Sequence, residues 1–475
     1  MRVYLETLGC QMNRLDSELL TGLLRAAGHE LTDDRRSADA VLYNTCSVRD
    51  HAENKVLSRL GADGKRKRHH RPNLVVGVLG CMAQRLGPEL RRKYPQVDFV
   101  CGPGQLPAVP ELIAEAAAGR PAARLDPGRG PAGREEAAEY GSGPATDPDS
   151  LDRGRDAAVA PLPGQAYVRV MRGCDNFCTY CIVPYVRGPE VSRRPEDVVE
   201  EVRRLVGAGR TQITLLGQAV NRYRWSDGGR EVRFADLLER VAGVAGLRRL
   251  RFVTSFPLDF DDDALAALRD LPAACEYLHC PAQSGSDAVL ARMRRGYTRG
   301  QYDELIARAC GLVPGVVLAG DFIVGFPGET DADHAASADL LRACGYKNSF
   351  VFKYSPRPGT VAARKLPDDV PEAVKRRRNK ELLAIQAEVG LAHHQGHVGR
   401  TLEVLVEGES TRADKQASAP AAGQTQLAGR SRWDHVVVFD GPRALIGQYV
   451  NVPITGATAV ALTGRTPDRS EPNTI

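Results

Sequence analysis

The stretch Arg172-Gly173-Cys174-Asp175-Asn176-Phe177-Cys178-Thr179-Tyr180-Cys181 follows directly on an apolar run, 166–171, that reads as a buried strand. Its three cysteines have the spacing CxxxCxxC. Thiolates bind iron–sulfur clusters or zinc, and either kind of site usually has four protein ligands. Three thiols are grouped here, so one metal position is left free for something else. The spacing by itself also permits a zinc loop that takes a distant fourth ligand.

Short apolar runs and amphipathic helical segments alternate around this stretch. The runs expected to form strands are 166–171, 212–216, 249–254, 277–279, 317–324 and 349–354. Helices are expected between them, and a long polar helix over 371–391 follows the last strand. This alternation predicts a partial (β/α)6 TIM-like barrel over 164–391, since eight units would be needed to close it. The CxxxCxxC loop lies at the C-terminal end of a barrel strand, where active sites gather.

A second α/β domain is predicted over 1–119, with a parallel sheet covered by helices. Its expected strands are 3–8, 40–44, 74–79 and 97–100. Cys10, Cys46 and Cys81 each follow directly on one of the first three strands. Because the C-terminal ends of parallel strands meet at one edge, three thiols converging there make a second cluster site plausible. A single cysteine at any of these positions would more often be a small buried hydrophobe.

The other cysteines lack this pattern. Cys101 ends the fourth strand of the first domain and is assigned to packing, although it has the chemistry of a fourth ligand. The remaining thiols have no paired spacing and are predicted to be core residues: Cys275, Cys280, Cys310 and Cys344.

The rest of the chain is organised around these two domains. Residues 120–163 are rich in Pro, Gly and Ala and predict a flexible linker. Short alternating strands over 392–467 predict a small β-barrel, followed by a tail over 468–475. No apolar stretch of about 18 residues is present, so a spanning helix is not expected. Eleven cysteines in 475 residues are too few for a disulfide scaffold, which favours a cytoplasmic protein.

The text RGCDNFCTYCIVPYVRGPEVSR (172–193) resembles the tRNA methylthiotransferase family of radical S-adenosylmethionine (SAM) enzymes, and ETLGCQMNRLDSE (6–18) is similar to the opening of that family. The resemblance implies that one [4Fe–4S] cluster, which chelates SAM, is held by Cys174, Cys178 and Cys181. It implies a second, auxiliary [4Fe–4S] cluster on Cys10, Cys46 and Cys81. The family uses two SAM per turnover, one for radical formation and one as methyl donor, with sulfur from the auxiliary cluster. Both sites are expected to face one cavity between the first two domains.

Further matched text lines the predicted barrel mouth. Gln218, Asn221, Ser255, Gln283 and Ser284 follow successive strands and can hydrogen-bond a nucleoside, so they are predicted to surround SAM and the substrate adenosine. The alternative is that these residues belong to ordinary turns. By resemblance, the C-terminal barrel is an RNA-binding TRAM domain.

Several segments are candidates for RNA contact. The net charge of +5 permits an RNA partner without requiring one. Within the C-terminal barrel, the candidate phosphate and base contacts are Arg430, Arg432, Trp433 and His435. Two basic runs, Lys65–Arg71 and Lys375–Arg378, are further candidates, each with a solvated helix face as the alternative.

The resemblance implies a monomeric transferase that adds a methylthio group to carbon 2 of N(6)-isopentenyladenosine at position 37 of tRNA. Its partners would be the anticodon loop and a flavodoxin-type electron donor, with no membrane. Related family members act on threonylcarbamoyl-adenosine in tRNA or on a ribosomal-protein aspartate, and both reactions remain alternatives. A non-catalytic Fe–S carrier with an RNA-binding tail is an alternative of another class.

Overall fold

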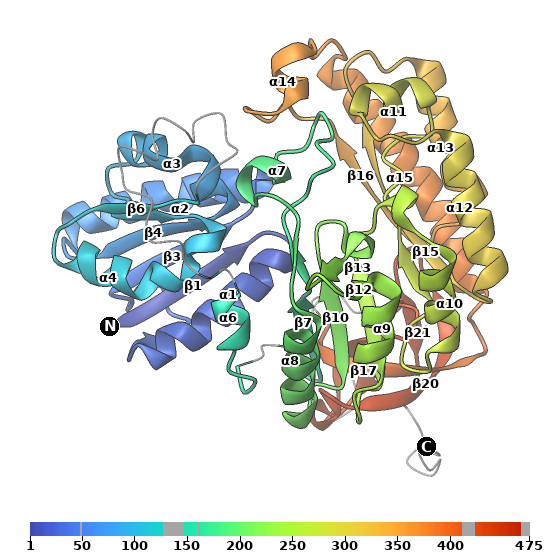
Figure 1. Ribbon diagram of the computed structural model, residues 1–475, viewed down its shortest axis with the longest axis horizontal. Helices are drawn as coiled ribbons and strands as arrows, with labels where there is room; N and C mark the ends of the chain where they lie inside the picture. The colour runs from blue at the N-terminus through green and yellow to red at the C-terminus, as the bar shows by residue number, and fades with distance from the viewer. Residues whose placement is uncertain (48–49, 127–146, 148, 160–161, 411–422, 467–475) are drawn as a thin grey trace.

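The computed structural model describes residues 1–47, 50–126, 147, 149–159, 162–410 and 423–466 (Figure 1). The N-terminal domain contains one parallel sheet of six strands in the order β2-β1-β3-β4-β5-β6. The strands are β1 (Arg2–Leu8), β2 (Glu30–Leu31), β3 (Ala40–Thr45), β4 (Val75–Gly80), β5 (Phe99–Cys101) and β6 (Ala122–Arg124). The central strands β3 and β4 are buried along their whole length, as expected of a parallel sheet covered on both faces.

Helices cover both faces of this sheet. Apolar side chains of α1 (Gln11–Ala26) and α4 (Val109–Ala117) pack on one face, and those of α2 (Asp50–His69) and α3 (Cys81–Lys93) pack on the other. A 3-10 turn, η1 (Pro103–Ala108), precedes α4. The predicted α/β domain is therefore confirmed.

The predicted incomplete barrel is also present. Its strands form two parallel sheets, β13-β10-β7 and β14-β15-β16, which are joined by a bridge between Leu250 and Ala274. Among the described residues no ladder joins β7 to β16, so the barrel has an open seam between these strands. The six strands are β7 (Gln165–Arg169), β10 (Gln212–Leu216), β13 (Arg249–Val253), β14 (Tyr277–His279), β15 (Val317–Val324) and β16 (Asn348–Lys353).

Helices follow the barrel strands on the outside (Figure 1). Side-chain caps define where several begin: Thr298 and Thr330 each form a capping box with the third residue of the helix that follows. The helices are α8 (Pro195–Gly207), α9 (Phe234–Ala242), α10 (Asp262–Asp270), α11 (Asp287–Met293), α12 (Arg299–Leu312), α13 (Asp331–Cys344), α14 (Val361–Lys365) and α15 (Glu372–Gln395). None of the described helices is both long and apolar enough to cross a bilayer.

The C-terminal region is a closed barrel with the strand order β17-β18-β19-β21-β20. Its strands are β17 (Thr401–Glu409), β18 (Thr425–Ser431), β19 (Val436–Gly441), β20 (Tyr449–Ala457) and β21 (Leu462–Gly464). It packs below the (β/α)6 barrel and against the end of α15 (Figure 1).

The range 120–163, which was predicted to be a flexible linker, contains two ordered elements. Strand β6 completes the N-terminal sheet by pairing with β5. Helix α6 (Ser150–Arg153) carries the buried Asp152, which pairs with Arg169 at 2.7 Å. The linker prediction is wrong for these two elements because strand pairing and a buried charge, rather than apolar periodicity, hold them. Residues 127–146, 148 and 160–161 of this range lie outside the described residues.

Buried ion pairs join the N-terminal domain to the barrel. Asp16 of α1 pairs with Arg169 of β7 at 2.7 Å and with Arg187 at 2.9 Å, and all three side chains are at most 6% exposed. A second group links Arg155 to Glu18 of α1 and to Glu201 of α8. Removing one partner from such a pair leaves an uncompensated buried charge, so these contacts fix the two domains against each other.

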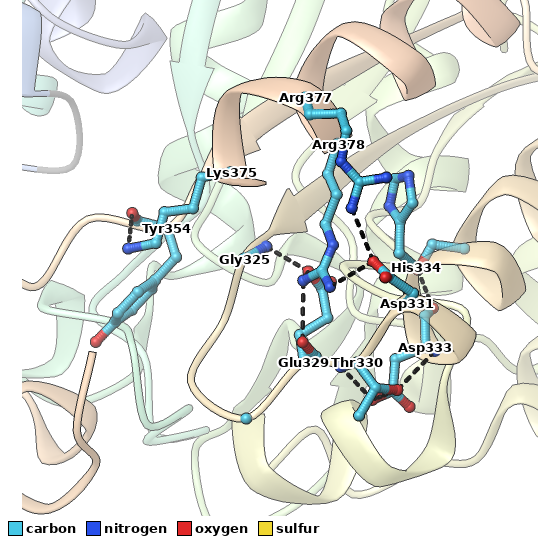
Figure 2. A network of polar contacts seen from close by, with 12 residues as sticks. Gly325, Glu329, Thr330, Asp331, Asp333, His334, Tyr354, Lys375, Arg377 and Arg378 are labelled. Atoms are coloured by element: carbon cyan, nitrogen blue, oxygen red, sulfur yellow. Dashed lines mark hydrogen bonds and ion pairs between the residues drawn. The ribbon is translucent and has the colours of Figure 1, made fainter. Parts of the chain in front are cut away.

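The basic run Lys375–Arg378 is engaged by the protein rather than free for RNA. Figure 2 shows Arg378 of α15 reaching Glu329 and Asp331, at 2.8 and 2.9 Å. Glu329 also accepts a hydrogen bond from the backbone N–H of Gly325. Lys375 is buried and pairs with Asp368 at 2.5 Å. The run therefore fastens α15 to the loop after β15, and its prediction as an RNA grip is wrong for these two buried cations.

Part of the other basic run also has structural partners. Lys67 pairs with Asp98 at 2.5 Å, and Arg71 pairs with Asp39 at 2.9 Å. Arg66 donates hydrogen bonds to the backbone carbonyls of Arg35, Arg36 and Ala38. These contacts hold the end of α2 against the sheet.

Candidate functional site

The CxxxCxxC loop leaves the barrel through a short antiparallel ribbon. In that ribbon β8 (Met171–Arg172) pairs with β9 (Val191–Ser192), and α7 (Val183–Val186) follows the third cysteine. Gly173 has φ +68°, and a Cβ there would collide with the carbonyls of residues 188 and 189. Thr179 fixes the middle of the loop: its N–H donates to Met293 O at 3.0 Å and its hydroxyl donates to Arg292 O at 2.8 Å. The sequence thus folds the loop onto the end of α11.

The three thiols of this loop converge in a buried place. Cys174 and Cys178 are 8% and 7% exposed. Burial raises the pKa of Cys174 to about 11 and raises that of Cys181 well above its usual range, and in both the charge of Cys178 adds to the increase. Three thiolates so close together repel one another, and a cation bound by all three removes this repulsion. The donor set therefore fits a metal cluster held by three thiolates.

The auxiliary cysteines are brought together by the register of the N-terminal sheet. β1, β3 and β4 are adjacent, and Leu8, Thr45 and Gly80 lie side by side at their C-terminal ends. The residues that follow place all three thiols at this edge. A hydrogen bond from Cys46 lowers the pKa of Cys10 to about 5, and the charge of Cys10 in turn reaches Cys81. Cys46 and Cys81 are 1% and 3% exposed.

A buried polar cluster supports this edge. Asn13 of α1 donates to the side chain of Asn44 at 3.0 Å, and Asn44 donates to Asn13 O at 2.9 Å. The Cys10 thiol donates to Asn13 Oδ1 at 3.3 Å. At Gly9 a Cβ would lie 2.6 Å from Asn13 Oδ1 and 2.9 Å from the Cβ of Cys46, so glycine is required for this close approach.

Cys101 lies elsewhere. It is fully buried in the apolar cluster that contains Leu79, Phe99 and Leu106. Burial raises its pKa well above the ordinary value. This location agrees with its assignment to packing.

Arg187 brings a positive charge from the barrel loop to the cysteines of the N-terminal domain. It follows α7 and is buried beside Asp16. Although burial opposes the charged form, the charges of Cys81, Asp16 and Cys10 raise the pKa of Arg187 well above its usual range. A fixed cation from the barrel loop therefore stands among the thiols of the N-terminal domain, where it offsets negative charge.

One cavity of about 790 Å³ runs between the two groups. It is lined by Cys10 and Cys46 from the N-terminal domain, while Cys81 is not among the lining residues and packs against Ile182 and Val186. The barrel loop contributes its whole triplet, and the C-terminal barrel contributes Arg430 and Asp434. The expectation of a shared cavity is met by five of the six thiols.

The predicted pocket residues divide into two groups. Gln218, Ser255 and Gln283 line the cavity. Asn221 and Ser284 are not among the cavity residues, and the protein occupies both side chains. Asn221 brackets the backbone of Phe256 with two hydrogen bonds of 2.8 Å, and Ser284 contacts the Ser337 hydroxyl at 3.3 Å. The latter two therefore brace the loops that carry the others.

Four lining residues other than glycine have left-handed backbone conformations: Phe177, Thr254, Gln283 and Asp434. Thr254 and Gln283 each have φ +69°, which is unusual for residues other than glycine. Gln283 is held there by two backbone bonds, from its N–H to Asp321 O and from Ile323 N–H to its carbonyl.

Sequence reasoning missed Arg295, although it lies in the matched text MRRGYT (293–298). Its side chain is 6% exposed, and its guanidinium donates to Cys178 Sγ at 3.4 Å and stacks over Phe256 with 4.6 Å to the ring centroid. The only sequence feature that could have pointed to Arg295 was a pair of adjacent arginines in the matched text. No pattern distinguished the buried arginine from Arg294, which is exposed.

The predicted RNA contacts of the C-terminal barrel are corrected by the structure. His435 is fully buried. Arg432 pairs with Glu276 at 2.7 Å, across the interface with the (β/α)6 barrel. Trp433 is partly buried against β14 and β15. Arg430 faces the cavity and pairs with Asp434 at 2.8 Å. The hairpin between β18 and β19 therefore attaches the C-terminal barrel to the (β/α)6 barrel, because its side chains contact residues of that larger barrel.

Comparisons with known proteins identify relatives of this chain. Residues 2–102 match the model of the uncharacterized protein family UPF0004, and residues 168–341 match that of the radical SAM superfamily. The tRNA-2-methylthio-N(6)-dimethylallyladenosine synthase of Rhodopirellula baltica is 46% identical, over 98% of this chain and 95% of the relative. The synthase of Moorella thermoacetica is 42% identical, over 97% of both chains.

A solved structure shares the fold. The radical SAM methyltransferase TsrM from Kitasatospora setae superimposes with a TM-score of 0.52 at 18% identity, over 76% of this chain and 75% of that one. At this identity the likeness concerns the fold alone. The full-length identity to the synthases, together with the two matched domain models, settles the family. This chain belongs to the tRNA-2-methylthio-N(6)-dimethylallyladenosine synthase family of radical SAM enzymes.

Proposed function

We propose that this protein is a transferase that adds a methylthio group to carbon 2 of N(6)-isopentenyladenosine at position 37 of tRNA. The observation that carries the proposal is the single cavity lined by cysteines from both triplets. A carrier of Fe–S clusters would have no need of a nucleoside-sized cavity between two cluster sites. The relatives' shared name supplies the substrate.

The proposed ligands of the SAM-binding [4Fe–4S] cluster are Cys174, Cys178 and Cys181, and those of the auxiliary [4Fe–4S] cluster are Cys10, Cys46 and Cys81. When bound, the first cluster and SAM supply the radical needed to break an unactivated C–H bond, and the second supplies sulfur. The second SAM of each turnover supplies the methyl group.

The protein's own groups hold the reactants. Gln218 and Gln283 offer amide donors and acceptors to a nucleoside in the cavity. The Ser255 hydroxyl is buried and has no hydrogen-bond partner among the described residues, so it is available to a ligand. Arg295 donates a hydrogen bond to Cys178 Sγ and so brings a buried positive charge to this proposed ligand.

We further propose that the anticodon loop of tRNA, a flavodoxin-type electron donor and a cytoplasmic location complete this function, with a monomer as the working unit. We also propose that the chain is divided into five parts, with β6 added to the first of them. The parts are 1–119, 120–163, 164–391, 392–467 and 468–475.

The test is an anaerobic reaction of the reconstituted protein with SAM, dithionite and tRNA bearing N(6)-isopentenyladenosine. We expect 5′-deoxyadenosine and, by nucleoside mass spectrometry, 2-methylthio-N(6)-isopentenyladenosine. Absence of 5′-deoxyadenosine would indicate a carrier. Product formed instead on threonylcarbamoyl-adenosine tRNA, or on the ribosomal protein, would overturn the substrate assignment.

A further inference from the structure

Three histidines from two parts of the chain meet where the C-terminal barrel docks on α15. His393 lies in the last turn of α15, His397 follows one turn later, and His435 precedes β19. The Nε2 atoms of His393 and His435 are 2.9 Å apart, and the His397 ring centroid is 4.5 Å from that of His435. One ring nitrogen of each residue lies within 4.8 Å of the others. This histidine cluster lies outside the Fe–S cavity, whose lining includes none of the three.

The surroundings orient the His435 ring toward the other two. The Ser431 hydroxyl lies 3.0 Å from His435 Nδ1 and also accepts a hydrogen bond from the His435 N–H at 3.2 Å. With Nδ1 engaged, Nε2 is the nitrogen left to face His393. Metal-binding histidines are held in the same way, with the second ring nitrogen bonded to a neighbouring polar group.

Hydrogen bonding within the cluster leaves one nitrogen unsatisfied. Two facing Nε2 atoms share one proton, and His397 Nδ1 is buried with no hydrogen-bond partner among the described residues. A metal ion accepts lone pairs from all three rings. Two nitrogens bound to one Zn²⁺ lie about 2.8 to 3.4 Å apart for angles between square and tetrahedral, which includes the separation of His393 and His435.

The electrostatic surroundings do not exclude a cation. The charge of Lys347 reaches His393 and His435, but Asp434 pairs with Lys347 at 2.7 Å. Asp434 is also paired with Arg251 and Arg430, and Arg400 adds positive charge near His397, so a bound cation would depend on the imidazole lone pairs rather than on a negative surrounding.

We propose that His393, His397 and His435 bind one Zn²⁺ ion that fastens the C-terminal barrel to α15. Imidazole nitrogen is a ligand that Zn²⁺ prefers, and three protein ligands leave the fourth position to water. The ion links residues about 40 positions apart in the sequence, at the junction between the barrel and the helix that leads to it.

The test measures zinc in the cluster-containing protein. The protein is purified anaerobically from zinc-supplemented cells, passed over a chelating resin and analysed by ICP-MS and zinc-edge X-ray absorption. We expect about one zinc per chain, with nitrogen and oxygen neighbours and no sulfur. Zinc with sulfur neighbours would place the ion on the cysteines and overturn the proposal, as would a zinc content near zero.

Variants locate the ion. His397→Ala, beyond the end of α15, is expected to reduce zinc at least tenfold while iron content stays unchanged, and His435→Ala is expected to do the same. His70→Ala, at an exposed position after α2, is the matched control and should retain zinc. Added Zn²⁺ should raise the Tm of the wild type and of His70→Ala but not that of His397→Ala. Zinc retained in a folded His397→Ala protein would refute the site. These readouts do not depend on methylthiolation.

Discussion

Arg295 places a buried positive charge at the proposed SAM-binding cluster site. Its guanidinium is buried, donates to Cys178 Sγ and stacks on Phe256 and Tyr297. The cysteines themselves were predictable because their spacing and their position after strands are visible in the sequence. Arg295 was not, because nothing in a pair of adjacent arginines tells which one is buried.

Replacement of Arg295 by Gln is expected to make the SAM-binding cluster harder to reduce. Removing a buried positive charge disfavours the extra electron, and a tenfold change in the one-electron equilibrium corresponds to about 59 mV. A redox titration followed by EPR should show a more negative potential by roughly that amount. Arg294→Gln, at the exposed neighbouring position, is the control, and an equal shift there would contradict the argument.

The two cysteine triplets should separate by function. Cys174→Ala is expected to abolish 5′-deoxyadenosine formation and to lower the iron content by about half, because two thiolates should not hold the cluster. Iron and sulfide assays on anaerobically reconstituted protein measure the second effect.

Cys46→Ala should leave SAM cleavage measurable but stop sulfur insertion into tRNA. Quantifying 5′-deoxyadenosine and methylthiolated nucleoside in the same reaction separates the two. Equal loss of both activities would mean that the triplets do not divide the chemistry.

At the scale of elements, strand positions followed from the sequence more closely than did the roles of charged residues. Strands β10, β14 and β15 have the predicted bounds because short, mainly apolar runs mark them. Strand β6 was missed because three residues of Ala-Ala-Arg carry no periodic signal and depend on pairing with β5. The Lys375–Arg378 run was misread because its buried acidic partners lie on other elements (Figure 2).

Glu329→Gln should destabilise the contact between α15 and the loop after β15. It removes a buried carboxylate that pairs with Arg378 and accepts from Gly325, and breaking such a pair costs about 3 kcal/mol. Calorimetry should show a lower Tm. Glu304→Gln, on the exposed face of α12, should change stability by less than about 0.5 kcal/mol.

At the scale of the whole molecule, buried charges join the domains. The prediction of three folded units followed from changes in pattern along the chain. The contacts between units, such as Asp16 with Arg169 and Arg187, involve residues more than 150 positions apart, so no local pattern could reveal them.

Asp16→Ala should weaken the contact between the N-terminal domain and the (β/α)6 barrel. It leaves Arg169 with Asp152 alone and leaves Arg187 without its acidic partner, so hydrogen exchange in α1 and β1 should become at least tenfold faster. SAM cleavage should decrease less than methylthiolation does, because the SAM-binding loop belongs to the barrel. Unchanged exchange would show that this contact does not hold the domains together.

The docking of the C-terminal barrel should be sensitive to acid. Burial alone would raise the pKa of Asp434. The positive charges of Lys347, Arg430 and Arg251 outweigh burial and hold this pKa well below its usual range. A carboxyl whose pKa is lowered by folding contributes stability above its unfolded pKa of about 3.9, and this contribution is lost as the pH falls.

As the pH falls below about 4, limited proteolysis of the C-terminal barrel by an acid protease should therefore increase in the wild type. Asp434→Asn should already be cleaved more readily at pH 7 and should change less with pH. Asp33→Asn, at an exposed position, should follow the wild type. A pH dependence that persists in full in Asp434→Asn would assign the effect to other groups.

The open seam of the barrel has a consequence for which parts of the chain line its interior. The cavity is lined by Tyr167 of β7 and by Phe350 of β16, the two strands that remain unjoined in the described part of the chain. A fully closed eight-unit cylinder would admit a ligand through its end, which suits small molecules. A cylinder that stays open along one side can instead share its interior with neighbouring domains, and here Cys10 of the N-terminal domain and Arg430 of the C-terminal barrel line the same cavity as the strands on either side of the seam.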